Sequence, residues 1–342
     1  MAAPPVDSLL LLSFGGPEGP ADVLPFLRRV TAGRGVPEAR LAQVAEQYAR
    51  FGGRSPINDQ NRALIDALVP ALATKGLDLP VYWGNRNSEP FLTSTLEQMA
   101  QDGRRHAAAF VTSAYSSYSG CRQYRDDLAR SASHVGAGAP QVTKLRQFFN
   151  HPGFVEPFAD GLRYAVDQLP PGVRAGARIV FTAHSIPASM ARSCRYVGQL
   201  QETARLVASA AGTGLPWELA YQSRSGPPAV PWLEPDVNDT LERLAFEGVT
   251  GAVLVPIGFV SDHMEVLFDL DTTAAATAER LGVAFARAAT PGTDGRFVDM
   301  VVELVAEVAT GGPVRALGDL GATTCMPSAC CPPPERRSAP SP

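Results

Sequence analysis

The chain alternates short apolar runs with longer segments in which apolar positions recur three and four residues apart. The apolar runs predict strands at residues 9–13, 80–83, 107–112, 141–146, 179–183 and 253–257. The periodic segments predict helices at residues 21–30, 38–51, 61–73, 91–101 and 153–168. Strands that alternate with helices are typical of βαβ units, so the pattern predicts an α/β fold with mostly parallel sheets.

Three short segments from the first half of the chain recur in the same order in the second half. The pairs are residues 9–17 with 179–187, 83–90 with 221–228, and 108–115 with 252–259. In the first pair, LLLLSFGGP and IVFTAHSIP, each segment has an apolar run, a polar turn and a closing proline. The repeat predicts two similar Rossmann-like halves, each a doubly wound parallel sheet. Between them we expect a cleft lined by the loops at the carboxyl ends of the strands.

We therefore expect an N-terminal half at residues 6–170, a C-terminal half at 171–310 and a flexible, cysteine-containing tail at 311–342. The segment PPGVRA at 170–175 marks the boundary between the halves. An amphipathic final helix at 296–310 is expected to pack back on the body. The prolines and serines of the tail are typical of a segment that forms no core.

Composition and charge narrow the classes of function. The 342 residues carry 34 acidic and 30 basic side chains, a net charge of −4, so the chain as a whole does not attract a nucleic-acid backbone. The apolar run at 9–12 is too short to cross a membrane, and no basic residue precedes it. We expect a soluble, cytoplasmic globular protein with no membrane span, no signal peptide and no nucleic-acid partner.

Several familiar cofactor and catalytic motifs are absent from the sequence. The first strand is not followed by Gly-x-Gly-x-x-Gly, and the chain has no Walker A, His-Glu-x-x-His or Gly-x-Ser-x-Gly sequence. The two halves therefore lack the dinucleotide fingerprint. Nucleotide-triphosphate, zinc-protease and serine-hydrolase functions lose their main support.

His184 is the strongest single candidate for chemistry. It directly follows the apolar strand at 179–183, which places it at a carboxyl strand end on the side of the expected cleft. An imidazole there can accept a proton near neutral pH or bind a metal ion. The plainer alternative is an ordinary polar residue.

An acidic run follows another strand, at residues 253–257. Ser261 is expected to cap a helix on which Asp262, Glu265 and Asp269, spaced three and four residues apart, share one face. Such a face is either a solvated first turn or a path for a hard cation.

Arginines gather in the segment that follows the first strand. They are Arg28, Arg29, Arg34, Arg50 and Arg54. Most surface arginines are simply solvated, but guanidinium groups along a cleft can hold the carboxylates of a polyacidic ligand.

The five cysteines are unevenly placed. Two lie in the body, at Cys121 and Cys194, and three lie in the tail, at Cys325, Cys330 and Cys331. So few cysteines in so long a chain do not form a disulfide framework. Three thiols in a short tail segment therefore suggest a bound ligand.

Six motifs together resemble the ferrochelatase family. They are LLSFGGP at 11–17, GGRSP at 52–56, GNR at 84–86, TAHSIP at 182–187, YQSRSGP at 221–227 and the run at 261–271. The resemblance implies a chelatase-like pair of Rossmann-like halves without a bound nucleotide. It also implies a lyase that inserts its substrate, Fe(II), into a porphyrin in haem biosynthesis.

The resemblance gives the acidic run and the histidine specific roles. His184 and Glu265 would be the catalytic and metal-binding residues, on opposite sides of the porphyrin macrocycle. Asp262, His263 and Asp269 would surround Glu265. Whether His184 or Glu265 delivers the iron, and which of them takes the pyrrole protons, stays open.

Ser55 and Tyr124 match family positions that contact the porphyrin edge and its propionates, while Phe14 stands where some members carry a tyrosine facing the metal. The segment at 30–37 is short and polar where members that use protoporphyrin IX at a membrane have an apolar lip. With the arginines, this favours coproporphyrin III as substrate, as in actinobacterial members.

The alternatives are a protoporphyrin IX ferrochelatase, a chelatase for another metal and a non-catalytic tetrapyrrole-binding protein. Transient contacts with neighbouring haem-pathway enzymes are expected.

The resemblance also implies a ligand role for the cysteines. Some ferrochelatases hold a two-iron, two-sulfur (2Fe-2S) cluster with one thiolate from the body and three from the C-terminal extension. The expected ligands here are Cys121, Cys325, Cys330 and Cys331, with Cys194 as the alternative body ligand. Zinc and free thiols are the competing explanations.

Overall fold

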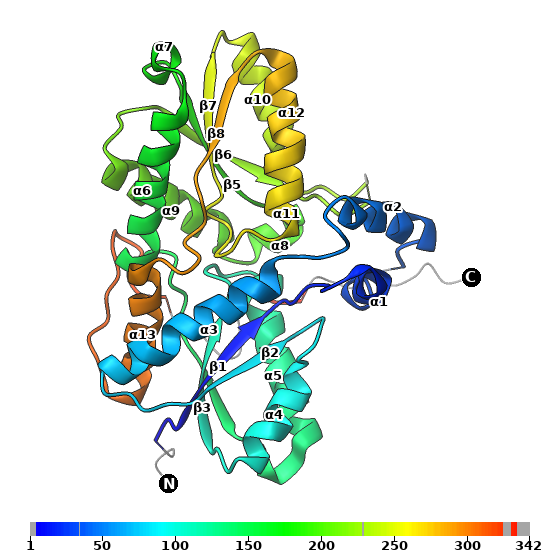
Figure 1. The fold of residues 1–342 in the computed structure, drawn as a ribbon, viewed down its shortest axis with the longest axis vertical. Helices are drawn as coiled ribbons and strands as arrows, with labels where there is room; N and C mark the ends of the chain where they lie inside the picture. The colour runs from blue at the N-terminus through cyan, green and yellow to red at the C-terminus, as the bar shows by residue number, and fades with distance from the viewer. Residues whose placement is uncertain (1–4, 34, 228, 324–329, 334–342) are drawn as a thin grey trace.

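The computed structural model describes residues 5–33, 35–227, 229–323 and 330–333, which contain two four-stranded sheets (Figure 1). The strands are β1 (Ser8–Ser13), β2 (Val81–Asn85), β3 (His106–Val111), β4 (Gln141–Lys144), β5 (Arg178–His184), β6 (Trp217–Gln222), β7 (Gly251–Val255) and β8 (Ala284–Arg287). The first sheet has the order β2-β1-β3-β4 and the second β6-β5-β7-β8, with all neighbours parallel. The predicted α/β class with two doubly wound halves is confirmed.

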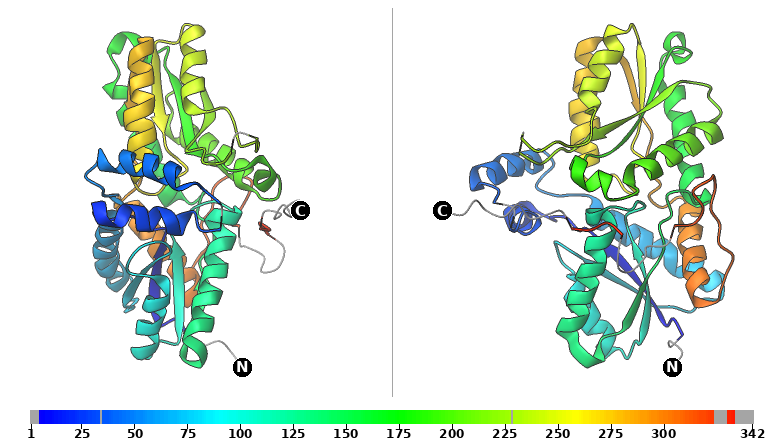
Figure 2. Two further views of the ribbon diagram at one scale, coloured as in Figure 1. Left: turned by 90° about the vertical axis from the view of Figure 1, so that its right-hand side faces the viewer. Right: turned by 180° about the vertical axis from the view of Figure 1, so that it is seen from behind.

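The strand orders also explain the internal repeat. The first repeated segments begin in β1 and β5, the second in β2 and β6, and the third in β3 and β7. Each pair occupies the same position in its own sheet. The sequence similarity therefore reflects two copies of one topology, which lie one above the other (Figures 1 and 2).

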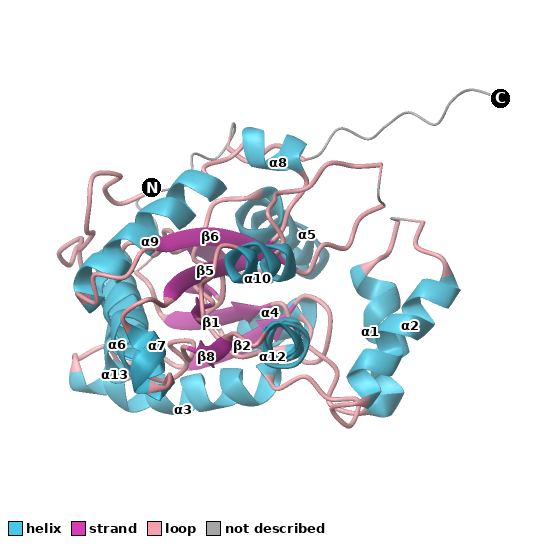
Figure 3. Ribbon diagram, turned by 90° about the horizontal axis from the view of Figure 1, so that it is seen from above, coloured by secondary structure: helices cyan, strands magenta, loops and turns pink. Residues whose placement is uncertain are grey.

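Helices cover both faces of each sheet (Figure 3). They are α1 (Pro20–Val30), α2 (Glu38–Ala49), α3 (Ile57–Thr74), α4 (Leu92–Gln101), α5 (Gln123–Val135), α6 (Pro152–Gln168), α7 (Pro171–Arg174), α8 (Ala188–Arg192), α9 (Tyr196–Ala211), α10 (Val237–Phe246), α11 (Met264–Val266), α12 (Ala275–Leu281) and α13 (Gly295–Ala309). Wider π-helical turns occupy Tyr118–Arg122 and Leu267–Ala274, and a short 3-10 turn occupies Gly136–Gly138. No helix in the described part of the chain is long and apolar enough to cross a membrane.

Burial on both faces explains the continuous apolar run of β1. Leu9 and Leu11 contribute to a core that α3, α6, α9 and α13 share, whereas Leu10 and Leu12 face the core under α4 and α5. Successive side chains of a strand point to opposite faces, so both sets must be apolar when both faces are covered.

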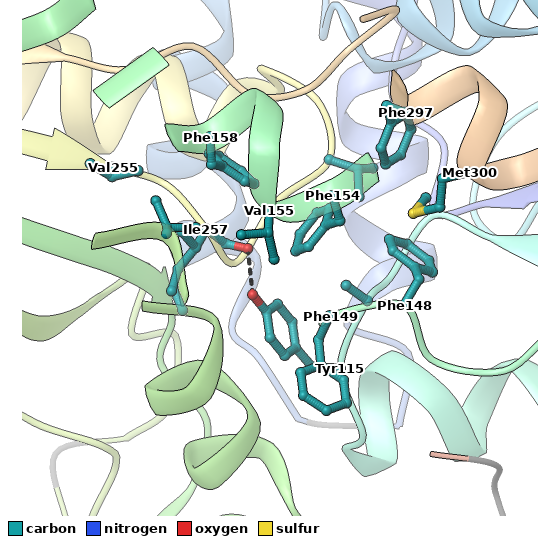
Figure 4. Packing of buried hydrophobic residues seen from close by; sticks show 14 of the residues in the cluster. Tyr115, Phe148, Phe149, Phe154, Val155, Phe158, Val255, Ile257, Phe297 and Met300 are labelled. Atoms are coloured by element: carbon teal, nitrogen blue, oxygen red, sulfur yellow. Dashed lines mark hydrogen bonds between the residues drawn. The ribbon is translucent and has the colours of Figure 1, made fainter. Parts of the chain in front are cut away.

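The shared core joins the two halves (Figure 4). Its centre is aromatic: the Phe154 ring lies edge-on to Phe148 and Phe158, with centroids 5.4 and 5.2 Å apart. The Tyr115 hydroxyl, from the loop after β3, donates a hydrogen bond of 2.9 Å to the carbonyl of Ile257, just after β7. The carboxyl ends of the two sheets are thereby held together.

Two helices cross between the sheets. The helix α6, which precedes the boundary predicted at residue 170, packs against α9, β7 and β8 of the second sheet. The last helix, α13, returns to contact α3 and β3 of the first sheet as well as α6. The boundary itself stays a prediction, but the halves exchange their covering helices.

The chain beyond α13 is fastened to the body as far as residue 323. Arg146 makes two hydrogen bonds of 2.8 Å to the Glu307 carboxylate and one of 2.8 Å to the Arg315 carbonyl. The side-chain amide of Asn150 donates to the carbonyls of Leu317 and Gly321, both at 2.9 Å. This part of the tail therefore follows a defined path over the body.

Replacing Gly153 by alanine tests the packing of α6 on α13. An added Cβ would overlap the Arg296 carbonyl oxygen and lie 2.8 Å from Met300 Cβ, so α13 would have to move. We expect a loss of about 1–3 kcal/mol in unfolding free energy, measured by urea denaturation. The matched control is Gly198→Ala in α9, where a Cβ meets no atom within 4 Å. It should be neutral or stabilise by up to about 1 kcal/mol. Equal effects of the two changes would contradict the packing argument.

Candidate active site

His184 is the last residue of β5 and points toward Glu265. Its Nδ1 lies 2.5 Å from the Ser185 carbonyl oxygen, which can only accept, so Nδ1 carries the hydrogen. Nε2 lies 3.5 Å from Oε1 of Glu265. In the neutral ring Nε2 is therefore the basic nitrogen, and it faces the carboxylate.

Glu265 is held from two sides. Its backbone N–H donates to Nδ1 of His263, and its carbonyl accepts a hydrogen bond of 2.9 Å from the Gln222 side chain. The side chains of His184 and Glu265 are 31% and 47% exposed, so solvent reaches both partners of the pair. The structure thus brings together the two residues that the sequence predicted, His184 from the end of β5 and Glu265 from the short helix α11.

The pair is too close to hold a porphyrin between its members. Each face of a planar ring needs a contact distance of about 3.5 Å, which is the whole separation of the two groups here. The predicted placement on opposite sides of a macrocycle therefore requires the two side chains to separate. That placement stays a prediction.

The helix of the acidic run begins later than the sequence suggested. The residue that caps α11 is His263, not Ser261, because the His263 ring accepts the Glu265 N–H. Asp262 lies before the helix, and α11 widens into the π-helical turn after Val266. The prediction that Asp262, Glu265 and Asp269 share one helix face is therefore wrong.

Asp262 and Asp269 have different partners as a result. Asp262 pairs with Arg287 of β8, at 3.0 Å between Nη1 and Oδ1. The Asp269 carboxylate accepts a hydrogen bond from the hydroxyl of Ser223, a residue with a left-handed backbone (φ 62°) that is strained for serine. Sequence reasoning assigned no role to Ser223 or Arg287, although Ser223 lies within the YQSRSGP motif.

The charges around Glu265 shift several pKa values. Burial lowers the pKa of His184, but the Glu265 charge and the hydrogen bonds to Glu265 and Ser185 outweigh it and raise the value to about 8. Burial opposes ionisation of Glu265, yet its interaction with His184 lowers the pKa to about 2. Burial and the nearby Glu265 charge raise the pKa of Asp269 to about 6, against the Ser223 hydrogen bond. Burial lowers the pKa of His263.

The predicted porphyrin-edge residues lie on the first half. Ser55, just before α3, is 4% exposed and packs beside the loop that follows β1. Tyr124 in α5 is also 4% exposed, and its ring lies under the Arg86 guanidinium at 4.6 Å. Arg86 reaches over Phe14 at 5.8 Å and pairs with Asp127. Sequence reasoning gave Arg86 no role of its own.

Three of the arginines after β1 have partners within the protein. Arg28 pairs with Glu38, and Arg54 pairs with Asp59, both at exposed positions. The Arg29 guanidinium donates to the Asn87 carbonyl at 2.8 Å. Arg34 lies outside the described residues.

The cysteines of the body and of the described tail approach one another. Cys121 is fully buried, with its sulfur 2.9 Å from the Gln147 amide. A hydrogen bond with Cys331 lowers the pKa of Cys194 to about 7, although burial opposes this. Cys330 and Cys121 both act electrostatically on Cys331, while Cys325 lies outside the described residues. Among the described residues, no three histidine, cysteine or acidic side chains form a group that could hold a metal ion.

A cavity of about 690 Å³ lies elsewhere, between α9 and β6. Its lining includes Trp217, Leu219, Tyr221 and Arg205. None of the predicted site residues belongs to the described residues that line it. The predicted cleft between the halves therefore stays a prediction.

Two four-stranded parallel sheets joined at their carboxyl ends, with a histidine at one of those ends paired to a carboxylate of a short helix, form an α/β fold of the kind found in chelatases. SirB from Bacillus subtilis, solved with Fe3+, shares this fold at a TM-score of 0.51 and 12% identity, over 90% of this chain and 96% of SirB. The ferrochelatase family model matches residues 6–309, and the chain belongs to the ferrochelatase family.

Relatives at higher identity agree with the family. The coproporphyrin III ferrochelatase of Streptomyces coelicolor is 54% identical, over 96% of this chain and 94% of that protein. The coproporphyrin III ferrochelatase of Frankia alni is 56% identical, over 96% and 87%. A ferrochelatase of Rhodopirellula baltica is 50% identical, over 96% and 94%.

Glu265→Gln tests the electrostatic coupling of the pair. Removing the carboxylate charge while keeping the burial should lower the His184 pKa from about 8 to below its ordinary 6.5, as followed by NMR titration of the ring. Because the folded-state pKa is raised, the pair stabilises the protein fully below pH 6.5, and this contribution disappears as the pH rises through about 8. The stability advantage of the wild type over the variant should therefore shrink between pH 6 and 9. The ring signal of exposed His134 serves as the internal reference, and an unchanged His184 titration would contradict the coupling.

Proposed function

We propose that this protein inserts Fe(II) into coproporphyrin III to give iron coproporphyrin III in haem biosynthesis. The observation that carries the proposal is the approach of the His184 ring, at the end of β5, to the Glu265 carboxylate of α11 in a chain of the ferrochelatase family. The relatives named coproporphyrin III ferrochelatase support the same substrate.

The reaction needs a base that becomes available only when the porphyrin is bound. Fe²⁺ replaces two pyrrole protons, which must pass to the protein or to water. While the pair is closed, Glu265 keeps His184 protonated near neutral pH. Separation of the pair by the macrocycle removes that support, and burial then favours the neutral imidazole. Once the imidazolium proton has passed to water, Nε2, fixed as the basic nitrogen by the Ser185 carbonyl, can accept one pyrrole proton, and the second pyrrole proton passes to water.

The separated Glu265 would face solvent as a free carboxylate. A carboxylate oxygen is a suitable ligand for Fe²⁺ as the ion loses water. Asp269, with a pKa of about 6, supplies a second carboxylate near neutral pH that acts electrostatically on Glu265. This assigns proton acceptance to His184 and iron delivery to Glu265, with Asp262 anchored away from the ion by Arg287.

The first half offers cations to a tetracarboxylate. The ion pairs of Arg28 and Arg54 are exposed and so contribute little to stability. A propionate can therefore replace Glu38 or Asp59 as the partner at small cost. Arg86 lies between the rings of Phe14 and Tyr124, but it is already paired with Asp127 in a nearly buried contact. Coproporphyrin III, with four propionates, can therefore bind more of these arginines than protoporphyrin IX, with two.

Substrate choice is tested by an anaerobic insertion assay with Fe(II) and either coproporphyrin III or protoporphyrin IX. One additional charged hydrogen bond is worth about 1.5 kcal/mol, so we expect kcat/KM to be at least roughly tenfold higher for coproporphyrin III. Absorbance of the metallated product gives the rate. Equal kcat/KM values for the two porphyrins, or a higher value for protoporphyrin IX, would contradict the proposal that coproporphyrin III is the substrate. Faster insertion of Co(II) than of Fe(II) would contradict the proposal that iron is the metal.

The catalytic role is tested with His184→Ala and Glu265→Gln in the same assay. His184→Ala removes the proton acceptor and should lower kcat by roughly 10²–10⁴. Glu265→Gln removes the carboxylate that delivers iron and should lower kcat/KM for Fe(II). Porphyrin binding, followed by fluorescence quenching, should persist. Wild-type protein that binds porphyrin without metallating it would instead be a tetrapyrrole carrier.

We further propose that Cys121, Cys325, Cys330 and Cys331 hold a 2Fe-2S cluster, with Cys194 as the alternative body ligand. Thiolates are the normal ligands of such a centre. The mutual interactions of Cys121, Cys194, Cys330 and Cys331 support a common site, although three of the described thiols still have to come closer together. When bound, the cluster would supply a one-electron redox centre.

Cysteine-to-serine variants at Cys121 and Cys194 test this ligand set. Anaerobically purified wild type should show visible absorption bands and an electron paramagnetic resonance signal after reduction. Cys121→Ser should lose both signals, and Cys194→Ser should keep them. The reverse result would make Cys194 the body ligand, while stoichiometric zinc or no bound metal in the wild type would remove the cluster. Cytoplasmic location and transient contacts with neighbouring enzymes stay predictions.

A further inference from the structure

Gln60 connects the first half of the protein directly to the loop that carries the acidic residues. Its Nε2 donates to the Asp262 carbonyl at 2.8 Å, and its Oε1 accepts from the Asp262 N–H, also at 2.8 Å. Gln60 lies in the first turn of α3, whose N-terminal end is beside α11 (Figure 1). One planar amide thus satisfies both backbone polar groups of a residue from the other half.

Two further contacts of this loop come from its own half. Arg287 of β8 binds the Asp262 side chain, and Gln222 of β6 binds the Glu265 carbonyl. These two contacts fix the loop on the second sheet. The two hydrogen bonds of Gln60 fix its position and orientation relative to the first half, because paired bonds to a planar amide allow little rotation.

The residues predicted to bind the porphyrin and the residue proposed to deliver the iron also lie in different halves. Ser55 and Tyr124, the predicted porphyrin contacts, belong to the first half, and Glu265 belongs to the second. Ser55 directly precedes Pro56, which caps α3, so a short and rigid path joins it to Gln60. Asp262 is separated from Glu265 only by His263 and Met264, and His263 caps the Glu265 N–H.

We propose that Gln60 is a positioning residue that sets the place of Glu265 relative to a porphyrin held by the first half. The inference rests on the proposed iron insertion. Without Gln60 the loop keeps its contacts to the second sheet and the Tyr115 bond at Ile257, but Asp262 loses its two direct hydrogen bonds to the first half. A misplaced carboxylate weakens delivery of iron far more than it weakens binding of porphyrin.

The test compares Gln60→Leu, which removes both hydrogen bonds, with Gln60→Glu, which keeps only the acceptor for the Asp262 N–H. The control is Gln168→Leu at the exposed end of α6. For Gln60→Leu we expect kcat/KM for Fe(II) to fall roughly tenfold or more, with the Kd for coproporphyrin III within about twofold of the wild type. Gln60→Glu should be intermediate, and the control should match the wild type.

Amide hydrogen exchange of the Asp262 N–H supplies a readout that does not depend on activity. It should be faster in Gln60→Leu than in the wild type and nearly unchanged in Gln60→Glu, which separates loss of the contact from general unfolding. Unchanged kinetics for iron in an active Gln60→Leu protein would overturn the positioning role, as would an equal loss of porphyrin affinity. If the wild type itself inserts no iron, the proposed function fails, while the exchange experiment still reports on the contact.

Discussion

The buried hydrogen bond from the Tyr115 hydroxyl to the Ile257 carbonyl joins the ends of the two sheets, and the candidate site depends on it. The Tyr115 side chain is 2% exposed, so an unpaired hydroxyl there would cost about 1–3 kcal/mol. The Tyr115 ring lies edge-on to Tyr196 at 5.9 Å, and the Tyr196 hydroxyl donates to the His184 carbonyl at 3.0 Å. The end of β5 is therefore anchored to the core that both halves share.

Because of this anchoring, His184 and Glu265 differ in how freely they can move. His184 ends a central strand and is held by Tyr196 and by the Ser185 carbonyl. Glu265 belongs to a three-residue helix that continues as a π-helical turn, in a segment held by side chains from three elements. Separation of the pair would therefore involve the glutamate side chain more than the histidine, since the histidine backbone is part of a sheet.

The sequence predicted where the strands end, and so which residues follow them, because the end of a strand is encoded in the nearby sequence. The apolar run before His184 marked the end of β5, and the repeated segments marked equivalent strands in both sheets. The residues that were missed act through partners remote in sequence: Arg287 pairs with Asp262, Ser223 with Asp269, and Gln60 with the Asp262 backbone. Periodicity carries no information about such contacts. The helix start was misplaced because Ser261 has the better capping side chain, while the fold gave the capping position to His263.

The sequence by itself determined the α/β class, the two similar halves, the family resemblance and the candidacy of His184 and Glu265. These follow from hydrophobic periodicity and motif spacing, which reflect local backbone geometry. Only the tertiary structure decided that His184 and Glu265 form a direct pair, that Asp262 turns to Arg287, and that Cys194 meets Cys331. Those contacts depend on how two sheets, a crossing helix and a fastened tail pack together, and the free energy of that packing is distributed over the whole core.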